Sequence, residues 1–326
     1  MRRWIEAARV RTLPLSVSGI LVGSLYALAN PTKKVYTPTE VFSWKIFWFA
    51  ILTTLGLQVL SNFANDYGDG IRGTDNEDRI GPKRAIQSGS ISAAAMKRAI
   101  AITALLTLAF ATTLIYYSFQ DTNFGYSLFY FVLALLAIAS AIRYTVGNTA
   151  YGYRGYGDMF VFVFFGLVST LGVNFLHSKQ IDMQLLLPAA AIGLLSTAVL
   201  NLNNMRDEES DRKAGKNTLV VKMGGAAARR YHYCLVIGAM VLVLIFALIY
   251  NGAGFKYDQY LFLLAYIPLT RHLIRVSKVT EPRQYDPELK KLAIATFLLA
   301  VLLSLSMIWL FQDITVQTVK AIGNNI

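Results

Sequence analysis

The sequence predicts an all-α, polytopic membrane protein, with about nine transmembrane helices around a central cavity that opens to the cytoplasmic side. Three observations support this fold class. The 326 residues are 55% hydrophobic and 15% charged, whereas soluble domains usually carry about 25% charged residues. Apolar segments of about 20 residues, the length that a membrane helix needs, recur along the chain. Lys and Arg gather in alternate loops between these segments.

The apolar segments are expected to be helices, because spans this long cannot be the short alternating strands of a lipid-facing barrel. In chain order they cover residues 13–29, 46–66, 97–118, 125–145, 158–177, 185–204, 231–250, 258–276 and 291–312. The first has the basic start and small-residue end of a signal peptide, but we expect it to be retained because further spans follow. The eighth is the weakest, since it runs into Arg271 and Arg275. We expect residues 1–326 to form a single membrane domain.

The distribution of basic residues predicts a cytoplasmic N-terminus. With the N-terminus inside, the inner segments hold 25 of the 31 Lys and Arg residues. Cytoplasmic loops carry such an excess. The net charge of +12 therefore follows from topology and gives no reason to expect nucleic-acid binding, because the basic residues are spread over many loops.

Two acidic clusters, each after an apolar span, are the strongest functional signal. The segments SNFANDYGDGIRGTDNEDR and NLNNMRDEESDRKAG together hold nine of the 19 carboxylates. Charge so close to hydrocarbon is expensive unless it is paired. Mg²⁺ binds carboxylate and amide oxygens and bridges them to phosphate. The clusters therefore predict a divalent-metal site for diphosphate chemistry at the cytoplasmic surface.

Helical spacing selects the carboxylates that can share this site. In the first cluster, four side chains on one helical face are Asn62, Asn65, Asp66 and Asp69. In the second, the matching side chains are Asn201, Asn204, Asp207 and Asp211. We predict that the four aspartates are catalytic metal ligands, joined by Asp75 from the loop part of the first cluster. We predict that Asn62, Asn65 and Asn204 bind substrate, because amides can bind phosphate oxygens or metal-bound water.

The remaining acids divide into two groups. Glu77, Asp78 and Glu209 are more simply explained as solvated helix ends, since they lie beyond the helix or off the shared face. Glu208 stays on that face, so both interpretations remain open for it.

Basic residues follow both clusters and could neutralise the oxygens of a bound diphosphate. They are Arg72, Arg79, Lys83, Arg84, Arg212, Lys213 and Lys216. Topology alone also places positive charge in these loops. We favour Arg72, Lys83 and Lys216 as substrate-binding residues, the last two because Gly or Pro marks their turns.

A third segment, YTVGNTAYGYRGYGD at 144–158, gathers four tyrosines at a helix end. An aromatic belt at the membrane interface explains most of them. Tyr144 closes a span, and we predict that it is catalytic, with its ring stabilising a carbocation.

These motifs resemble those of the UbiA superfamily of intramembrane aromatic prenyltransferases. The segments that carry the resemblance are VRTLPLS at 10–16, NDYGDGIRGTDNEDRIGPKRAIQSG at 65–89, the tyrosine segment at 144–158, and NLNNMRDEESDRKAGKNTLVVKMG at 201–224. They are most similar to the 1,4-dihydroxy-2-naphthoate polyprenyltransferases, including the long spacing between Asp69 and Asp75. We add Arg11, from the first segment, to the expected substrate-binding residues.

The resemblance implies a Mg²⁺-dependent enzyme in the cytoplasmic (inner) membrane of a bacterium. Its expected partners are polyprenyl diphosphate, 1,4-dihydroxy-2-naphthoate and the lipid bilayer, with no protein partner and no nucleic acid. The diphosphate would leave, the naphthoate ring would attack the allylic cation, and loss of CO₂ would give a demethylmenaquinol of menaquinone biosynthesis.

Two alternatives remain open. The acceptor could be 4-hydroxybenzoate, as in ubiquinone biosynthesis. The chain could also be a secondary transporter, because the two acidic motifs form a weak repeat and repeats occur in transporters. Transporters place their charges near the midplane of the membrane, whereas these charges lie at helix ends, which favours the enzyme.

Overall fold

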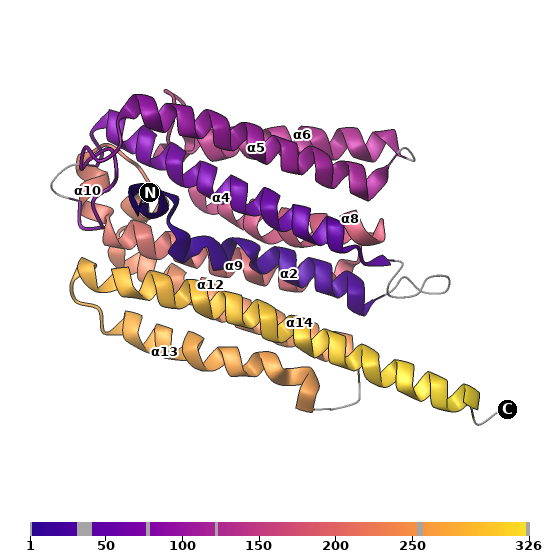
Figure 1. Ribbon diagram of the computed structural model, residues 1–326. Coiled ribbons are helices and arrows are strands. Elements are labelled where there is room, and N and C mark those ends of the chain that lie inside the picture. Colours follow the sequence, from indigo (N-terminus) through magenta and orange to yellow (C-terminus); the bar gives the residue numbers. More distant parts are fainter. Residues whose placement is uncertain (1, 31–40, 76–78, 121–122, 253–256, 324–326) are drawn as a thin grey trace.

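The computed structural model describes residues 2–30, 41–75, 79–120, 123–252 and 257–323, most of them in long helices that run side by side (Figure 1). The first helices are α1 (Arg2–Ala8), η1 (Val10–Thr12), α2 (Leu13–Ala29), α4 (Trp44–Arg72), α5 (Ala93–Phe119) and α6 (Phe124–Arg143). The middle of the chain forms η2 (Tyr151–Arg154), α7 (Gly157–Val161), the π-helical η3 (Phe162–Gly172), α8 (Val173–Ser178), η4 (Met183–Leu185) and α9 (Leu186–Arg206). The last elements are α10 (Glu208–Lys213), α11 (Leu219–Met223), α12 (Gly225–Asn251), η5 (Tyr257–Ala265), α13 (Tyr266–Ser277), η6 (Pro282–Gln284) and α14 (Tyr285–Gly323).

Seven helices of the described ranges are long and apolar enough to cross a membrane, or eight if the bent pair α1–α2 counts as one span. The predicted helical membrane fold is confirmed, but the count of nine is not. The segment predicted at 258–276 folds as η5, which is non-helical at Tyr260, followed by the 12-residue α13. Arg271 and Arg275 shorten its apolar stretch, so α13 buries Leu269 and Val276 on one face and exposes the two arginines.

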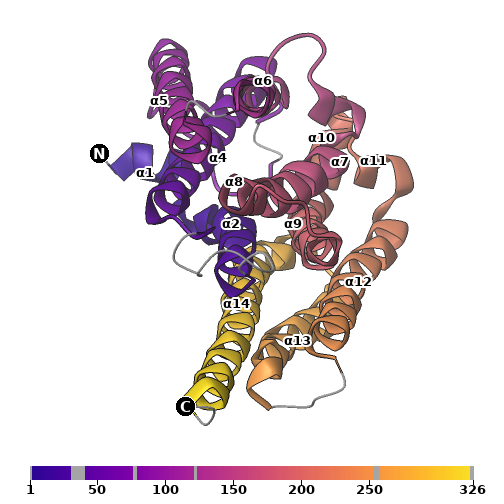
Figure 2. The same ribbon diagram turned by 90° about the vertical axis from the view of Figure 1, so that its right-hand side faces the viewer.

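The helices form three groups when the bundle is viewed end-on (Figure 2). Helices α4, α5 and α6 lie on one side, α12, α13 and α14 lie on the other, and α2 and α7–α9 lie between them. Helix α9 is the most enclosed, with Ile192, Leu195 and Leu202 fully buried. Its neighbours α12 and α14 complete one large core, while α1, α4 and α5 share a smaller one.

Close helix packing replaces the hydrophobic effect as the main attraction, because lipid tails are as apolar as the helices themselves. Helix α2 meets η3 through two glycines one turn apart, Gly19 and Gly23. A Cβ atom on Gly23 would lie 2.2 Å from the carbonyl oxygen of Thr170, and one on Gly19 would lie 1.9 Å from Ser169 Oγ. Only glycine fits at such an approach, and this contact helps to build one wall of the cavity described next.

Candidate active site

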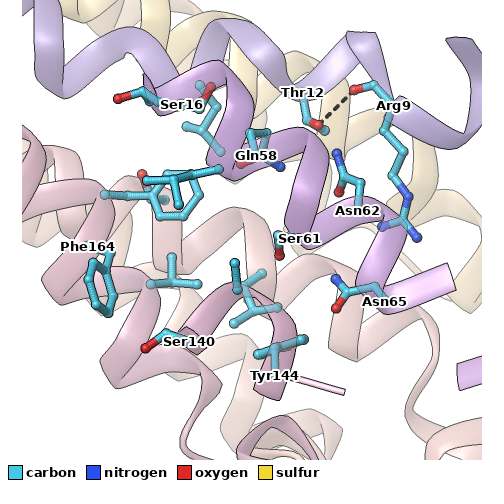
Figure 3. A pocket seen from close by; sticks show the side chains of 18 of the residues that line it. Arg9, Thr12, Ser16, Gln58, Ser61, Asn62, Asn65, Ser140, Tyr144 and Phe164 are labelled. Atoms are coloured by element: carbon cyan, nitrogen blue, oxygen red, sulfur yellow. Dashed lines mark hydrogen bonds between the residues drawn. The ribbon is translucent and has the colours of Figure 1, made fainter. Parts of the chain in front are cut away.

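A cavity of about 740 Å³ enters the bundle between α2, α4, α6 and the segment around η3. Its lining on α4 reaches from Asp69 back to Ala50, about 28 Å at 1.5 Å per residue, which is close to the thickness of the hydrocarbon layer. Polar side chains such as Arg9, Asn62 and Asn65 lie near the acidic end (Figure 3). The deeper lining is mainly apolar, with these residues among its members: Ile20, Leu57, Leu114, Ile115, Leu133, Phe164 and Val168.

The first acid cluster consists of Asp66, Asp69 and Asp75, whose exposed fractions are 2%, 1% and 7%. The first two lie in the last turns of α4. Gly73, with φ of +72°, ends the helix in the left-handed conformation that glycine adopts readily. The chain then turns back, and the N–H of Thr74 donates to the carbonyl of Asp69 at 3.0 Å. This turn returns Asp75 to its helical neighbours.

The second acid cluster consists of Asp207 and Asp211, each 4% exposed. Asp207 caps the C-terminus of α9, and Asp211 lies in the short helix α10. The N–H of Asp211 donates to the carbonyl of Asp207 at 2.8 Å, and the N–H of Lys216 donates to the carbonyl of Asp211 at 2.8 Å. These backbone bonds hold both carboxylates and the lysine at one end of the bundle.

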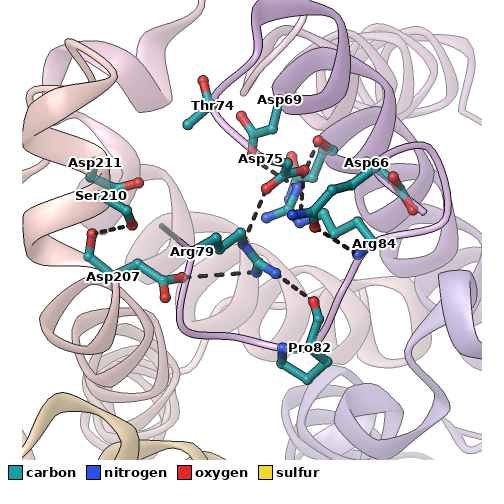
Figure 4. Close-up of polar contacts among 12 residues, drawn as sticks. Asp66, Asp69, Thr74, Asp75, Arg79, Pro82, Arg84, Asp207, Ser210 and Asp211 are labelled. Atoms are coloured by element: carbon teal, nitrogen blue, oxygen red, sulfur yellow. Dashed lines mark hydrogen bonds and ion pairs between the residues drawn. The ribbon is translucent and has the colours of Figure 1, made fainter. Parts of the chain in front are cut away.

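Arg79 and Lys216 bridge the two acid clusters. Arg79 Nε lies 3.0 Å from Asp75 Oδ1, and its Nη2 lies 3.8 Å from Asp207 Oδ2 (Figure 4). Lys216 Nζ lies 3.6 Å from both Asp69 Oδ2 and Asp211 Oδ1. The loop after α4 and the loop after α10 therefore bring positive charge between carboxylates from opposite halves of the chain.

Two further arginines bind the same acids. Arg84 lies 2.8 Å from Asp69 and 3.2 Å from Asp75. Arg206 pairs with Asp207 at 2.7 Å and with Asp286 of α14 at 2.6 Å. Among the described residues, no group of three or more His, Cys, Asp or Glu side chains is arranged to hold a metal ion.

Burial and these cations act against each other on the pKa values. Burial raises the pKa of Asp75 in spite of Arg84. Burial also raises the pKa of Asp211 to about 6, against the effect of Lys216. Asp207 is desolvated too, but its hydrogen bonds from Arg206 bring its pKa below the ordinary value. Such buried charges are stable only while they are paired.

The donor set fits a hard divalent cation. Carboxylate oxygens from two halves of the chain gather at one end of the bundle, and carboxylate oxygens are ligands that Mg²⁺ prefers. Asp75 Oδ2 is buried and lies 3.2 Å from Arg84 Nε, without a hydrogen bond of good geometry within the described ranges, so Arg84 is the partner that a metal ion would replace at this oxygen. Metal ligation would require the acids to exchange some of their Arg and Lys partners.

The sequence matches the model of the UbiA prenyltransferase family over residues 35–293. This chain belongs to the UbiA prenyltransferase family. It is 41% identical to the 1,4-dihydroxy-2-naphthoate octaprenyltransferase of Haemophilus influenzae over 94% of this chain and 96% of that protein. The protein of the same name from Escherichia coli is 41% identical over 92% and 94% of the two chains, and that from Mycobacterium tuberculosis is 34% identical over 76% and 78%.

Solved structures of UbiA homologues share the fold. A homologue from Archaeoglobus fulgidus, solved with DMAPP and Mg²⁺, aligns with a TM-score of 0.62 at 15% identity over 94% of this chain and 99% of that one. The apo structure of a homologue from Aeropyrum pernix aligns with a TM-score of 0.60 at 15% identity over 92% and 98%. The sequence-based assignment to the UbiA superfamily is thus confirmed.

In this UbiA family member, some predicted site residues line the cavity and others do not. Those that line it are Asn62, Asn65, Asp66, Asp69, Lys83, Tyr144 and Lys216. Asp75, Asp207 and Asp211 lie behind them in the ion-pair network. Asn204 is buried and does not line the cavity, whereas its neighbour Asn203 does. Arg72 also lies outside it: its guanidinium donates to the Gly147 carbonyl and lies 4.2 Å from the centre of the Tyr153 ring.

Several predicted residues have a structural partner. Asn62 donates to the Ala8 carbonyl at 2.9 Å and ties α4 to α1. Asp66 accepts from the backbone N–H groups of Ala85 and Ile86 at 3.1 and 3.2 Å, so it also anchors the loop that carries Arg79 and Arg84.

The other predictions divide between the surface and the undescribed part of the chain. Glu209 is exposed, and Glu208 pairs with Arg212 at 2.8 Å. Glu77, Asp78 and the side chain of Arg11 lie outside the described part.

Sequence reasoning missed three residues that contact or line the site. Arg9, at the break between α1 and η1 with φ of +51°, lines the cavity near Asn62 (Figure 3). Tyr153 donates to Asp69 Oδ1 at 2.8 Å. Arg206 fixes Asp207. Arg9 lies next to the VRTLPLS segment and Tyr153 lies within the tyrosine segment, but spacing alone could not select either residue.

Proposed function

We propose that this protein transfers a polyprenyl group from polyprenyl diphosphate to 1,4-dihydroxy-2-naphthoate with loss of CO₂, giving a demethylmenaquinol. The observation that carries the proposal is 41% identity, along nearly the whole of both chains, to proteins named 1,4-dihydroxy-2-naphthoate octaprenyltransferase. The cavity supports it, because a charged mouth above a long apolar wall suits a diphosphate head and a prenyl tail.

The diphosphate would bind at the mouth, among the two acid clusters and their cations. Mg²⁺ would be held by five carboxylates: Asp66, Asp69, Asp75, Asp207 and Asp211. Residues 1–326 would act as one domain. Bound Mg²⁺ would neutralise charge on the leaving diphosphate. Arg79 and Lys216 already lie between the clusters and could turn their charge to phosphate oxygens.

In the proposed reaction, the C–O bond of the donor breaks and the diphosphate leaves with the electron pair. The ring carbon that bears the carboxylate attacks the allylic cation and forms the new C–C bond. CO₂ then leaves, and its bonding electrons restore the aromatic ring. The Tyr144 ring would stabilise the cation, and the apolar walls would keep water away from it.

The acidic end of the bundle is proposed to face the cytoplasm of a bacterium. The excess of Lys and Arg, 25 of 31 on this side, supports that orientation. A soluble naphthoate and the diphosphate head would then enter from the same compartment.

Purified protein offered polyprenyl diphosphate, Mg²⁺ and either 1,4-dihydroxy-2-naphthoate or 4-hydroxybenzoate tests the proposal. We expect product from the naphthoate, no comparable product from 4-hydroxybenzoate, and loss of activity in EDTA that added Mg²⁺ restores. Preference for 4-hydroxybenzoate would overturn the acceptor assignment, and full activity in EDTA would overturn the metal requirement. Accumulation of unmodified substrate in sealed vesicles would indicate a transporter.

A further inference from the structure

Gln58 places an unpaired amide oxygen in the wall of the cavity, on the α4 side. It lies on α4, its side chain lines the cavity, and its Oε1 is shielded from solvent without a hydrogen-bond partner among the described residues. A buried carbonyl without a partner is destabilising. Because the terminal torsion of glutamine is broad and roughly two-fold, the amide can turn this oxygen toward a molecule in the cavity.

The depth of Gln58 matches the place where the acceptor ring must lie. Gln58 is one turn before Asn62 and two turns before Asp66 on the same helical face, and Figure 3 shows Gln58, Asn62 and Asn65 following one another in that order along α4. It therefore lies about 12 Å from Asp66 along the helix axis. The prenyl carbon that reacts is attached directly to the diphosphate at the acids, and the attacking ring carbon must approach it to about 3–3.5 Å.

Among the parts of the two proposed substrates, only a ring hydroxyl can satisfy an acceptor here. An ionised diphosphate offers oxygens that accept hydrogen bonds, and a prenyl chain offers no polar group. The naphthoate has two hydroxyls. Its 1-hydroxyl neighbours the carboxylate and donates to it within the molecule, whereas its 4-hydroxyl has no such internal partner.

We propose that Gln58 Oε1 accepts a hydrogen bond from the 4-hydroxyl of the naphthoate, and so makes Gln58 a specificity-determining residue for the acceptor. This inference rests on the proposed function. The bond fixes the ring in its plane and turns the carboxylate-bearing carbon toward the reacting prenyl carbon. It also selects against acceptors without a donor at this position, because they leave the amide oxygen unpaired.

The test compares 1,4-dihydroxy-2-naphthoate with 1-hydroxy-2-naphthoate, which keeps the carboxylate and the activating 1-hydroxyl and lacks only the 4-hydroxyl. In the wild type we expect kcat/KM to favour the dihydroxy acid by about tenfold or more. Gln58→Met keeps the length of the side chain and removes the amide. It should lose about tenfold on the dihydroxy acid, keep its rate on the monohydroxy acid, and thereby lose the preference.

Thr53→Val is the matched control. Thr53 lines the same cavity on the same helix, but its hydroxyl already donates to the Phe49 carbonyl at 2.8 Å. This variant should keep the wild-type preference. The comparison of ratios cancels the different intrinsic reactivities of the two acids.

Each outcome decides a different question. If Gln58→Met keeps the wild-type ratio, or loses both acids equally, the glutamine does not recognise the hydroxyl and the inference is overturned. Equal affinity of wild-type protein for the two acids, measured by equilibrium binding, overturns it without any variant. If the wild type prenylates neither naphthoate, the proposed function itself fails.

Discussion

At the scale of single residues, the site is an alternation of buried acids and buried cations. Asp69, Asp75 and Asp207 each contact an arginine, and Lys216 contacts Asp69 and Asp211. A buried carboxylate is stable in this place only with such a partner. The same cations carry the donors that a diphosphate needs. In the structure they hold the acids, and in the proposed function they would exchange these carboxylates for the oxygens of the diphosphate.

Arg79→Met should make the protein depend on Mg²⁺ for its stability. The variant removes the cation that Asp75 and Asp207 share, so each carboxylate keeps only one arginine partner among the described residues, Arg84 or Arg206, and its buried charge is less well compensated. We expect a lower Tm than wild type in EDTA and a larger rise in Tm when Mg²⁺ is added. Arg79→Lys keeps the charge without the guanidinium fork, so its Tm in EDTA and its rise in Tm with Mg²⁺ should lie between those of the wild type and Arg79→Met. An identical Mg²⁺ response in all three proteins would contradict this role.

Asp207→Asn should reduce prenyl transfer by about 100-fold or more, because one charged group at the leaving-group site is lost. Glu209→Gln is the matched control from the next helix. Its carboxylate is 79% exposed and lies 3.9 Å from Lys213, and such surface pairs contribute little. Turnover of both variants with saturating Mg²⁺ is the measurement, and equal turnover would remove Asp207 from the site.

Helical spacing selected aspartates that are buried in the structure. Polar residues at i, i+3 and i+4 near the end of a membrane helix share one face, and that face points into the bundle. Spacing could not select Arg79 or Tyr153, since their contacts with Asp207 and Asp69 join residues far apart in the chain. It favoured Asn204 over Asn203, because spacing alone does not show that the face of α9 with Val199, Leu200 and Asn203 is the one that lines the cavity.

At the scale of elements, α4 is the scaffold of the site. It carries Asp66 and Asp69 at its end, and Gly68 between them packs on the start of the loop after α6. The hydroxyl of Thr145 in that loop donates to the Ala64 carbonyl at 2.9 Å. This contact between helix ends therefore helps to position the two acids of α4 and the neighbouring Tyr144.

Gly68→Ala should lower both activity and Tm. A Cβ atom at this position would lie 2.7 Å from the Thr145 carbonyl oxygen, and the backbone cannot yield without moving α4 from α6. Overpacking of this kind typically costs about 1–3 kcal/mol. Gly73→Ala, where a Cβ atom meets nothing within 4 Å, should show only the backbone strain of its positive φ, about 1 kcal/mol. If the two variants have equal activity, the contact at Gly68 does not position the site.

Helix prediction was confirmed where apolar runs were long, whereas the span predicted at 258–276 was not confirmed as one long helix. There, η5 and α13 divide the run, and α13 turns its charged face outward, with Arg271 and Arg275 exposed. Hydropathy averages over the two faces of a helix, so it cannot separate a short amphipathic helix from a weak membrane span.

At the scale of the whole molecule, chemistry and charge gather at one end of the bundle. Both acid clusters, the loops that carry their cations and the N-terminus lie together (Figure 1). Helix α9 connects this end, at Arg206, with the opposite end, at Leu186. The cavity continues from the charged end through most of the apolar layer, so in the proposed function the polar substrate parts and the prenyl tail would occupy successive depths of one space.

Cysteine labelling can test the orientation that this asymmetry predicts. In a Cys234→Ser background, which removes the chain's single cysteine, Lys213→Cys lies at the acidic end and Ile181→Cys lies at the other end, and both positions are exposed. A membrane-impermeant maleimide should label Ile181→Cys in right-side-out vesicles and Lys213→Cys in inverted ones. The physical reason is the excess of Lys and Arg around the acidic end, which resists transfer across the membrane. Labelling of Lys213→Cys in right-side-out vesicles would place the acid clusters outside and would require the aromatic acid to arrive from that side.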